Sequence, residues 1–274
     1  MLRIEKIHPG ERLSIDPRES AFSHGMGIFE SLQISEGRLQ FWSRHWSRLK
    51  ESALHLFAYT LSDADESTSL EAIIAYFHEN GKNNFVLKLS LMVLATGPVL
   101  YIYSRERFIN DTNGKLCLKN THPINENSVY AGYKTHNYLE NIWLLKEAKA
   151  VGYTDYLRLN TKSEVCETCV GNCFFIKGNQ VITTSIQTGL FPGIIRAVLL
   201  EALAIEEKQI KVEDLKVMDG CFMTNSIVGI LPILEIAGFS NQSVLSFTES
   251  SLSKIEETKS ILKRIAQSES VNLN

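Results

Sequence analysis

Two spacings of apolar residues appear in the first part of the chain, one typical of strands and one of helices. Apolar and polar positions alternate on both sides of the turn at 35–37, which predicts a hairpin. Trp42, Trp46, Leu49 and Ala53 then recur every three or four residues, which predicts an amphipathic helix. The elements predicted up to residue 103 are strands at 27–34, 38–41, 85–95 and 99–103 and helices at 43–57 and 69–80.

A polar stretch at 110–127 divides the chain. It contains Gly114, Pro123 and five asparagines, a composition typical of a connection between domains. The boundaries that follow are a smaller N-terminal α/β domain at 1–112, an interdomain connection at 113–127 and a larger C-terminal domain at 128–274.

The second part mixes both spacings again. Its predicted helices lie at 137–151, after Gly193 and at 250–266, and its predicted strands lie at 115–119, 156–159, 173–176, 181–184, 222–224 and 230–236. The polar tail at 267–274 is expected to fray. Strands and helices in both parts predict an α/β or α+β fold.

Composition limits the possible partners. The 274 residues are 44% hydrophobic, and 28 Lys+Arg nearly balance 31 Asp+Glu, which is typical of a soluble globular protein and gives no basic footprint for nucleic acid. The longest apolar stretch, 89–103, is interrupted by polar residues and is too short to span a membrane. Charges at Arg3, Glu5 and Lys6 argue against an export signal, so we expect a cytoplasmic protein.

Five cysteines, an odd number, fit a reducing compartment better than a disulfide framework. Cys166, Cys169 and Cys173 form a C-x2-C-x3-C cluster, which raises the question of a zinc or iron–sulfur site. A closed site needs a fourth ligand, and the remaining cysteines stand alone in the sequence. We therefore interpret the cluster as core packing and predict no metal.

Several residues could carry chemistry. Lys134 precedes a helix among Gly, Tyr and small polar residues, where desolvation would make its amine a nucleophile. The Gly-flanked loop at 188–196 runs into an apolar helix, whose first amides can bind an anion. Arg48 and the hydroxyl-rich turn at 224–226 could add contacts to the same anion. Glu167 adjoins a buried strand, so its carboxylate needs a partner, either a protonated pyridine nitrogen or a local Lys or Arg.

Taken together, five segments of the chain resemble the fold-type IV, or class IV, pyridoxal-phosphate enzymes. They occur in the family's order and with similar spacing. The segments are HWSRLKESAL at 45–54, YKTHNYLEN at 133–141, ETCVGNCFF at 167–175, GLFPGIIR at 189–196 and TNSIVGILPI at 224–233. The family includes branched-chain aminotransferases, D-amino acid aminotransferases and 4-amino-4-deoxychorismate lyases.

The resemblance implies a two-domain fold with the site at the domain interface, a homodimer and pyridoxal 5'-phosphate as cofactor. Lys134 would bind the cofactor as a Schiff base and act as general acid and base, and Glu167 would pair with the pyridinium nitrogen. The phosphate would be bound by Arg48, by the amides of Ile194 and Ile195 and by Ser226. Tyr138 and Asn172 would complete the cofactor site.

Within the family, the lyase is favoured. Two residues, Thr135 and His136, separate Lys134 from the Asn-Tyr pair, one fewer than branched-chain aminotransferases usually have. The region 94–98 lacks the arginine of the D-amino acid enzymes, and Asn225-Ser226 looks most like the lyases. The resemblance therefore favours conversion of 4-amino-4-deoxychorismate to p-aminobenzoate and pyruvate; the alternative is a class IV aminotransferase, and a cofactor-free or metal-binding relative also stays open.

The substrate contacts are less well defined by the resemblance. His24 stands where the family usually has tyrosine and Ser31 where it usually has threonine, and both are candidates for the substrate pocket. Lys88, Arg105 and Arg107 are the candidates for binding a substrate carboxylate.

Overall fold

The computed structural model describes residues 2–106, 113–238, 243–247 and 249–274. Its helices are α1 (Ser20–Ser23), α2 (Trp42–Phe57), α3 (Asp63–Asn80), α4 (Leu139–Ala150), α5 (Ile194–Ala202) and α6 (Glu249–Ser268), with 3-10 turns η1 (Ile186–Thr188) and η2 (Val212–Val217). The chain forms two compact units: unit 1 holds residues 1–108, 133–137 and 266–274, and unit 2 holds 109–132 and 138–265. Each unit is built on one sheet, which confirms the α/β class.

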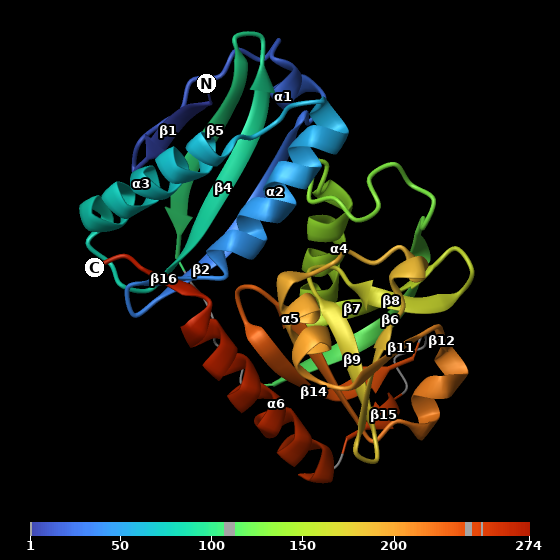
Figure 1. Ribbon diagram of the computed structural model, residues 1–274. Helices are drawn as coiled ribbons and strands as arrows, with labels where there is room; N and C mark the ends of the chain where they lie inside the picture. Colours follow the sequence, from blue (N-terminus) through green and yellow to red (C-terminus); the bar gives the residue numbers. More distant parts are fainter. Residues whose placement is uncertain (1, 107–112, 239–242, 248) are drawn as a thin grey trace. The chain divides into compact units, whose positions relative to one another are not determined.

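Unit 1 contains a six-stranded sheet in the order β1-β5-β4-β2-β3-β16. Its strands are β1 (Arg3–Ile7), β2 (Gly27–Ser35), β3 (Arg38–Gln40), β4 (Phe85–Leu94), β5 (Gly97–Arg105) and β16 (Ser270–Asn272). Helices α2 and α3 lie across one face of this sheet (Figure 1). Alternation in the strands directs Leu32, Leu89 and Ile102 toward Trp46 and Tyr76 of these helices, and all five side chains are buried. The opposite face of the sheet, which we call the open face, carries Ser31, Lys88 and Ser90.

Helix α3 begins six residues earlier than the pattern predicts. Ser62 accepts a hydrogen bond from the Asp65 amide, and Asp65 accepts one from the Ser62 amide, which together form a capping box. The first turn also contains the negative charges of Asp63, Asp65 and Glu66, which stabilise the helix by interacting with the positive end of its dipole. These short-range polar signals, rather than apolar spacing, set the start of the helix.

We expect Ser62→Ala to lower the free energy of unfolding by about 1 kcal/mol, because the Asp65 amide loses its cap. Urea denaturation followed by circular dichroism measures this. Ser67→Ala, an exposed site later in the same helix, is the matched control and should change stability by less than about 0.5 kcal/mol. Equal effects of the two changes would contradict the capping assignment.

Two segments of unit 1 differ from the sequence-based expectations. The tail was expected to fray, which is wrong: β16 pairs antiparallel with β3, with Val271 opposite Leu39, and Leu273 is buried. Strand β1 was not predicted and pairs in parallel with β5, so that Arg3 lies opposite Val99. Both strands are short and gain their partners from distant parts of the chain, so local periodicity does not reveal them.

Unit 2 contains a larger sheet in the order β11-β10-β9-β13-β14-β6-β7-β8-β12, with β15 paired to β14. Its strands are β6 (Gly114–Ile124), β7 (Asp155–Asn160), β8 (Glu164–Thr168), β9 (Asn172–Lys177), β10 (Gln180–Thr184), β11 (Ile205–Lys208), β12 (Ile210–Lys211), β13 (Gly220–Asn225), β14 (Gly229–Ala237) and β15 (Ser243–Ser246). The predicted connection at 113–127 thus includes strand β6, which pairs in parallel with both β7 and β14. Buried Leu116 and Leu118 anchor it.

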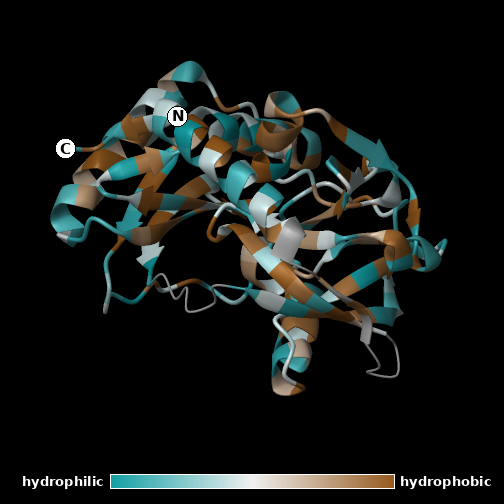
Figure 2. Cartoon of the chain, turned by 90° about the horizontal axis from the view of Figure 1, so that it is seen from below, coloured by the Kyte–Doolittle hydropathy of each residue, from teal (hydrophilic) through white to brown (hydrophobic). Residues whose placement is uncertain are grey.

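The distribution of apolar residues in the structure agrees with the assignment of sheets and covering helices. Figure 2 shows apolar segments along the strands and a mixture of apolar and polar segments on the helices, as expected for amphipathic helices that each bury one side. None of the helices in the part of the chain that the structure describes combines the length and hydropathy that a bilayer span requires.

Candidate active site

Lys134 is fixed in unit 1 by backbone pairing to strand β2. The Phe29 amide donates to the Lys134 carbonyl at 2.9 Å, and the His136 amide donates to the Gly27 carbonyl at 2.9 Å. A Cβ on Gly27 would lie 2.3 Å from His136 Nδ1, so only glycine permits this approach. The Lys134 amine lies 4.7 Å from the centroid of the Phe29 ring. The segment thereby places the Lys134 amine on the open face, next to Phe29 of β2.

A second lysine lies over the same aromatic ring. Lys88 Nζ is 3.6 Å from the Phe29 centroid and donates to Ser31 Oγ at 2.9 Å. Register explains the contact, because Ser31 and Lys88 are directly opposite on β2 and β4. Burial, together with the charges of Lys134 and Arg105, lowers the pKa of Lys88 to about 6. Without a counter-ion, its amine is therefore largely neutral at pH 7.

His136 also belongs to this group. Its Nε2 lies 2.8 Å from Ser90 Oγ on β4. Burial and the nearby Lys88 lower the pKa of His136 to about 4, so the imidazole is neutral at physiological pH. A neutral ring beside the two lysines adds no further positive charge to the open face.

Arg48 lies on the helix-covered side of the sheet of unit 1, in a buried cluster with Glu30 and His45. Arg48 Nε and Nη2 donate to the two Glu30 oxygens at 2.7 and 2.6 Å, and His45 Nδ1 lies 2.7 Å from Glu30 Oε2. Burial opposes ionisation of Glu30, but the Arg48 charge and these hydrogen bonds outweigh it and hold the pKa of Glu30 well below its usual value. The predicted phosphate role of Arg48 stays a prediction.

Sequence reasoning missed Glu30. The available signal was an acidic residue in alternation with the apolar Ile28, Leu32 and Ile34, since a carboxylate buried on that face requires a cation. Arg48 supplies this cation, and His45, three residues earlier on the same helix, hydrogen-bonds to the same carboxylate.

The substrate candidates of unit 1 occupy different environments. Ser31 is buried on the open face and accepts the Lys88 hydrogen bond. His24 is exposed, and its Nδ1 contacts Ser23 Oγ at 2.8 Å. Arg105 ends strand β5 and is exposed, whereas Arg107 lies outside the described residues.

Glu167 and Asn172 meet in unit 2. Asn172 Nδ2 donates to Glu167 Oε2 at 3.0 Å and to the Phe191 carbonyl at 2.8 Å, so it joins the β8–β9 turn to the loop before α5. Both side chains are buried. Gly193 must lack a side chain here, because its Cβ would lie 2.3 Å from Asn172 Oδ1. The predicted carboxylate and the predicted anion loop are thus brought together.

The start of helix α5 has the features expected of an anion site. Gly193 is the N-cap and no side chain caps the helix. The amides of Ile194 and Ile195 therefore belong to the first helical turn, which offers donors and a positive dipole end. Both side chains are buried, which fixes the helix in place.

The turn at 224–226 lies on the strand next to Asn172. Thr224 is directly opposite Asn172 in the β13–β9 pairing. Asn225 Oδ1 accepts the amides of Ile227 and Val228, each at 2.9 Å, which closes the turn around Ser226. Thr224 Oγ1 is buried, and no group of the described residues hydrogen-bonds to it. A buried hydroxyl without a partner is uncommon and leaves Thr224 with an unused capacity to hydrogen-bond to an external group.

The donor set of unit 2 fits pyridoxal phosphate. A buried carboxylate suits a pyridinium nitrogen, while an uncapped helix start and an unpartnered hydroxyl suit a phosphate. Tyr138, adjacent to α4, donates to the Cys169 carbonyl at 3.4 Å. Burial, aided by the charges of Glu167 and Asp155, raises the pKa of Tyr138, so its hydroxyl stays protonated.

The cysteines are packed in the interior. All five are free and buried. Cys166 Sγ donates to the Thr188 carbonyl at 3.3 Å, and burial raises the pKa of Cys166, Cys169 and Cys173, which disfavours the thiolates that metals bind. Among the residues with described positions, no cluster of His, Cys, Asp and Glu could hold a metal ion.

Comparison with known proteins points to one family. The family model described as Amino-transferase class IV matches residues 27–236. An aminodeoxychorismate lyase of Bacillus subtilis is 24% identical over 243 residues, which cover 81% of each chain. A candidate branched-chain-amino-acid aminotransferase of Aquifex aeolicus is 26% identical over 255 residues, 84% of this chain and 82% of that protein.

Solved structures show the same fold. A candidate 4-amino-4-deoxychorismate lyase from Legionella pneumophila aligns with a TM-score of 0.81 at 23% identity, over 95% of this chain and all of that one. A branched-chain aminotransferase from Thermoproteus uzoniensis, solved with norvaline, also has a TM-score of 0.81, at 18% identity, over 97% of this chain and 96% of that one. The two activities are matched about equally well.

Proposed function

Because the chain belongs to the amino-transferase class IV family, we propose that it is a pyridoxal-phosphate-dependent lyase that converts 4-amino-4-deoxychorismate to p-aminobenzoate and pyruvate. The observation that carries the proposal is the Asn225 turn. Its side chain closes the turn that presents Ser226, and the Asn-Ser pair is the feature that most resembles the lyases. The match to the Bacillus subtilis lyase supports this choice.

In this proposal, one set of residues holds the cofactor and Lys134 moves the substrate proton. Glu167, oriented by Asn172, pairs with the ring nitrogen, while the Ile194 and Ile195 amides, Ser226 and Arg48 bind the phosphate. Tyr138 completes the cofactor site. When bound, pyridoxal phosphate supplies an electron sink next to the substrate nitrogen.

Lys134 moves the proton. Its amine would hold the cofactor and, when free, would take the proton from the ring carbon of the substrate that bears nitrogen. The carbon–oxygen bond to the enolpyruvyl group breaks, its electron pair leaves with the oxygen, and the proton taken by Lys134 passes to the methylene carbon to give pyruvate. The ring becomes aromatic, which makes the reaction strongly favourable. His24 and Ser31 line the substrate side, and the protein acts as a homodimer.

The second candidate is a class IV aminotransferase. It is favoured by the match to the Aquifex aeolicus protein, whose 26% identity and coverage of 84% of this chain are slightly higher than the 24% and 81% of the Bacillus subtilis lyase. The two activities share the roles given to Lys134 and Glu167. They differ in whether a carbon–oxygen bond of the substrate breaks.

We expect the purified enzyme to release equal amounts of p-aminobenzoate and pyruvate from 4-amino-4-deoxychorismate. Chromatography measures p-aminobenzoate, and a coupled lactate dehydrogenase assay measures pyruvate. A parallel assay supplies a panel of L- and D-amino acids with 2-oxoglutarate and measures keto-acid formation. Keto-acid formation without p-aminobenzoate would establish the aminotransferase instead. Failure to take up pyridoxal phosphate would exclude both activities.

A further inference from the structure

The turn at 168–171, which joins β8 to β9 and which we call the clamped turn, is held by side chains of other elements. Asp155, the first residue of β7, binds two of its amides: Oδ1 accepts a hydrogen bond from the Cys169 amide at 3.1 Å, and Oδ2 accepts one from the Val170 amide at 3.3 Å. Asn141 of α4 donates from Nδ2 to the Cys169 carbonyl at 2.7 Å. Side chains therefore hold the turn from both of its polar sides.

The clamped turn is also fixed against strand β13. The Val170 carbonyl accepts a hydrogen bond from Asn225 Nδ2 at 3.1 Å, so all four backbone polar groups of the two central residues are bound by side chains. A Cβ on Gly171 would lie 2.6 Å from the Thr224 carbonyl oxygen, so only glycine permits this approach. Most protein hydrogen bonds join backbone to backbone, and a turn held instead by converging side chains is fixed in one position by them.

Asp155 is the most deeply buried of these side chains, at 0% exposure. The groups that bind it are neutral donors: the amides of Tyr156, Cys169 and Val170 and the side chains of Thr168 and Cys169. Burial raises the pKa of Asp155, and these hydrogen bonds oppose the shift. Because a buried carboxyl group that loses its donors is strongly destabilising, moving the turn away from Asp155 is unfavourable.

The clamped turn lies between the residues assigned to the cofactor. It joins Glu167, near the end of β8, to Asn172, the first residue of β9, whose Nδ2 donates to Glu167 Oε2 at 3.0 Å. The Tyr138 hydroxyl donates to a carbonyl of the turn at 3.4 Å. Asn225, which donates to the turn, also closes the loop that presents Ser226. One short segment thus sets the positions of side chains from three other elements.

We propose that Asp155 is a positioning residue, which holds the amides of the clamped turn and thereby orients the Glu167 carboxylate toward the ring nitrogen of the cofactor. Asn141 supports the same orientation through the Cys169 carbonyl. The inference rests on the proposed function, because that function assigns the ring nitrogen to Glu167. It is measurable without turnover, since the loss of either side chain should weaken chiefly those ligands that have a ring nitrogen.

The test compares two ligands of the purified protein stripped of cofactor: pyridoxal phosphate and its carbocyclic analogue, in which a C–H group replaces the ring nitrogen. Equilibrium dialysis gives both dissociation constants, and their ratio is the preference for the nitrogen. We expect the wild type to prefer pyridoxal phosphate, Glu167→Gln to lose the preference, and Asp155→Asn to reduce it about tenfold. General damage to the fold would weaken both ligands alike and leave the ratio unchanged.

Asp219→Asn is the matched control. Asp219 Oδ2 accepts a hydrogen bond from the Gly178 amide at 2.6 Å, so this exposed aspartate holds the turn at the opposite end of β9. Its loss should leave both dissociation constants unchanged. Asn141→Ala is the second variant, because Asn141 is only half-buried and its removal leaves Asp155 in place. It should reduce the preference about three- to tenfold, even if Asp155→Asn does not fold.

The outcomes separate the positioning role from the proposed activity. If Glu167→Gln loses the preference while Asp155→Asn and Asn141→Ala keep it, the positioning role is wrong and the assignment of Glu167 stands. If the wild type does not prefer pyridoxal phosphate, Glu167 does not meet the ring nitrogen, and both assignments fail. If the preference changes as expected but neither p-aminobenzoate nor a keto acid forms, the positioning role stands and the proposed activity fails.

Discussion

Lys134→Ala should abolish covalent attachment of pyridoxal phosphate and reduce turnover by a factor of about 10²–10⁴ or more, the size of a lost proton-transfer catalyst. The fold should survive, because the hydrogen bond from Phe29 uses the backbone carbonyl of Lys134 and not its side chain. Borohydride reduction followed by mass spectrometry measures attachment: the wild type should gain one phosphopyridoxyl group, located on the peptide that contains residue 134.

Lys82→Ala is the matched control, since Lys82 is an exposed lysine of the same unit. It should retain both the fixed cofactor and the wild-type rate. Lys88→Ala is informative as well, because Lys88 lies over the same Phe29 ring. If the cofactor were fixed to the Lys134→Ala variant through Lys88, the assignment of the two lysines would have to be exchanged.

The elements with local signals were predictable from the sequence. The helix predicted at 43–57 is observed as Trp42–Phe57, and the strands predicted at 173–176 and 181–184 are observed as the antiparallel pair β9–β10. In both cases the apolar period or a turn with glycine lies within the segment itself. The loop before α5 and the acidic segment at 167 were identified in the same way, from residues close together in the sequence.

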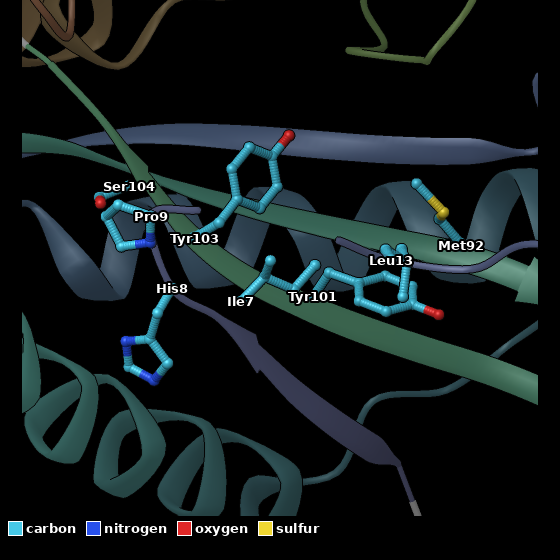
Figure 3. Close-up of a pocket in the computed structure, with 8 residues that line it drawn as sticks. All are labelled: Ile7, His8, Pro9, Leu13, Met92, Tyr101, Tyr103 and Ser104. Atoms are coloured by element: carbon cyan, nitrogen blue, oxygen red, sulfur yellow. The ribbon is translucent and has the colours of Figure 1, made fainter. Parts of the chain in front are cut away.

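The parts that could not be predicted depend on partners distant in the chain. Strand β6 continues to Ile124, beyond the strand predicted at 115–119. Its polar second half resembles a linker and is a strand only through its pairing with β7. The five residues at 133–137 belong to unit 1 although the chain on both sides belongs to unit 2. Their attachment to β2 depends on a glycine at position 27, whose importance is visible only when His136 lies against it. The apolar pocket lined by Leu13, Met92 and Tyr101 (Figure 3) is likewise assembled from segments that strand register brings together, which no single segment encodes.

Glu30→Ala should lower the free energy of unfolding by about 3–5 kcal/mol, because it leaves the Arg48 guanidinium and the buried His45 without their common partner. Glu30 is only 2% exposed, so water cannot replace the lost carboxylate. Urea denaturation measures the change. Glu51→Ala, an exposed site on α2, should change stability by less than about 0.5 kcal/mol.

The loss of stability caused by Glu30→Ala should also depend on pH and become smaller in acid. The pKa of Glu30 is lowered in the folded protein, so its charge contributes stability above the unfolded-state pKa of about 4.3 and this contribution is lost as the pH falls toward the folded-state value. The stability difference between the wild type and Glu30→Ala should therefore be full at pH 7 and narrow below about pH 4. A difference that stays constant down to the acid limit would mean that Glu30 acts through packing and not through its charge. A difference that widens in acid would contradict the buried ion pair altogether.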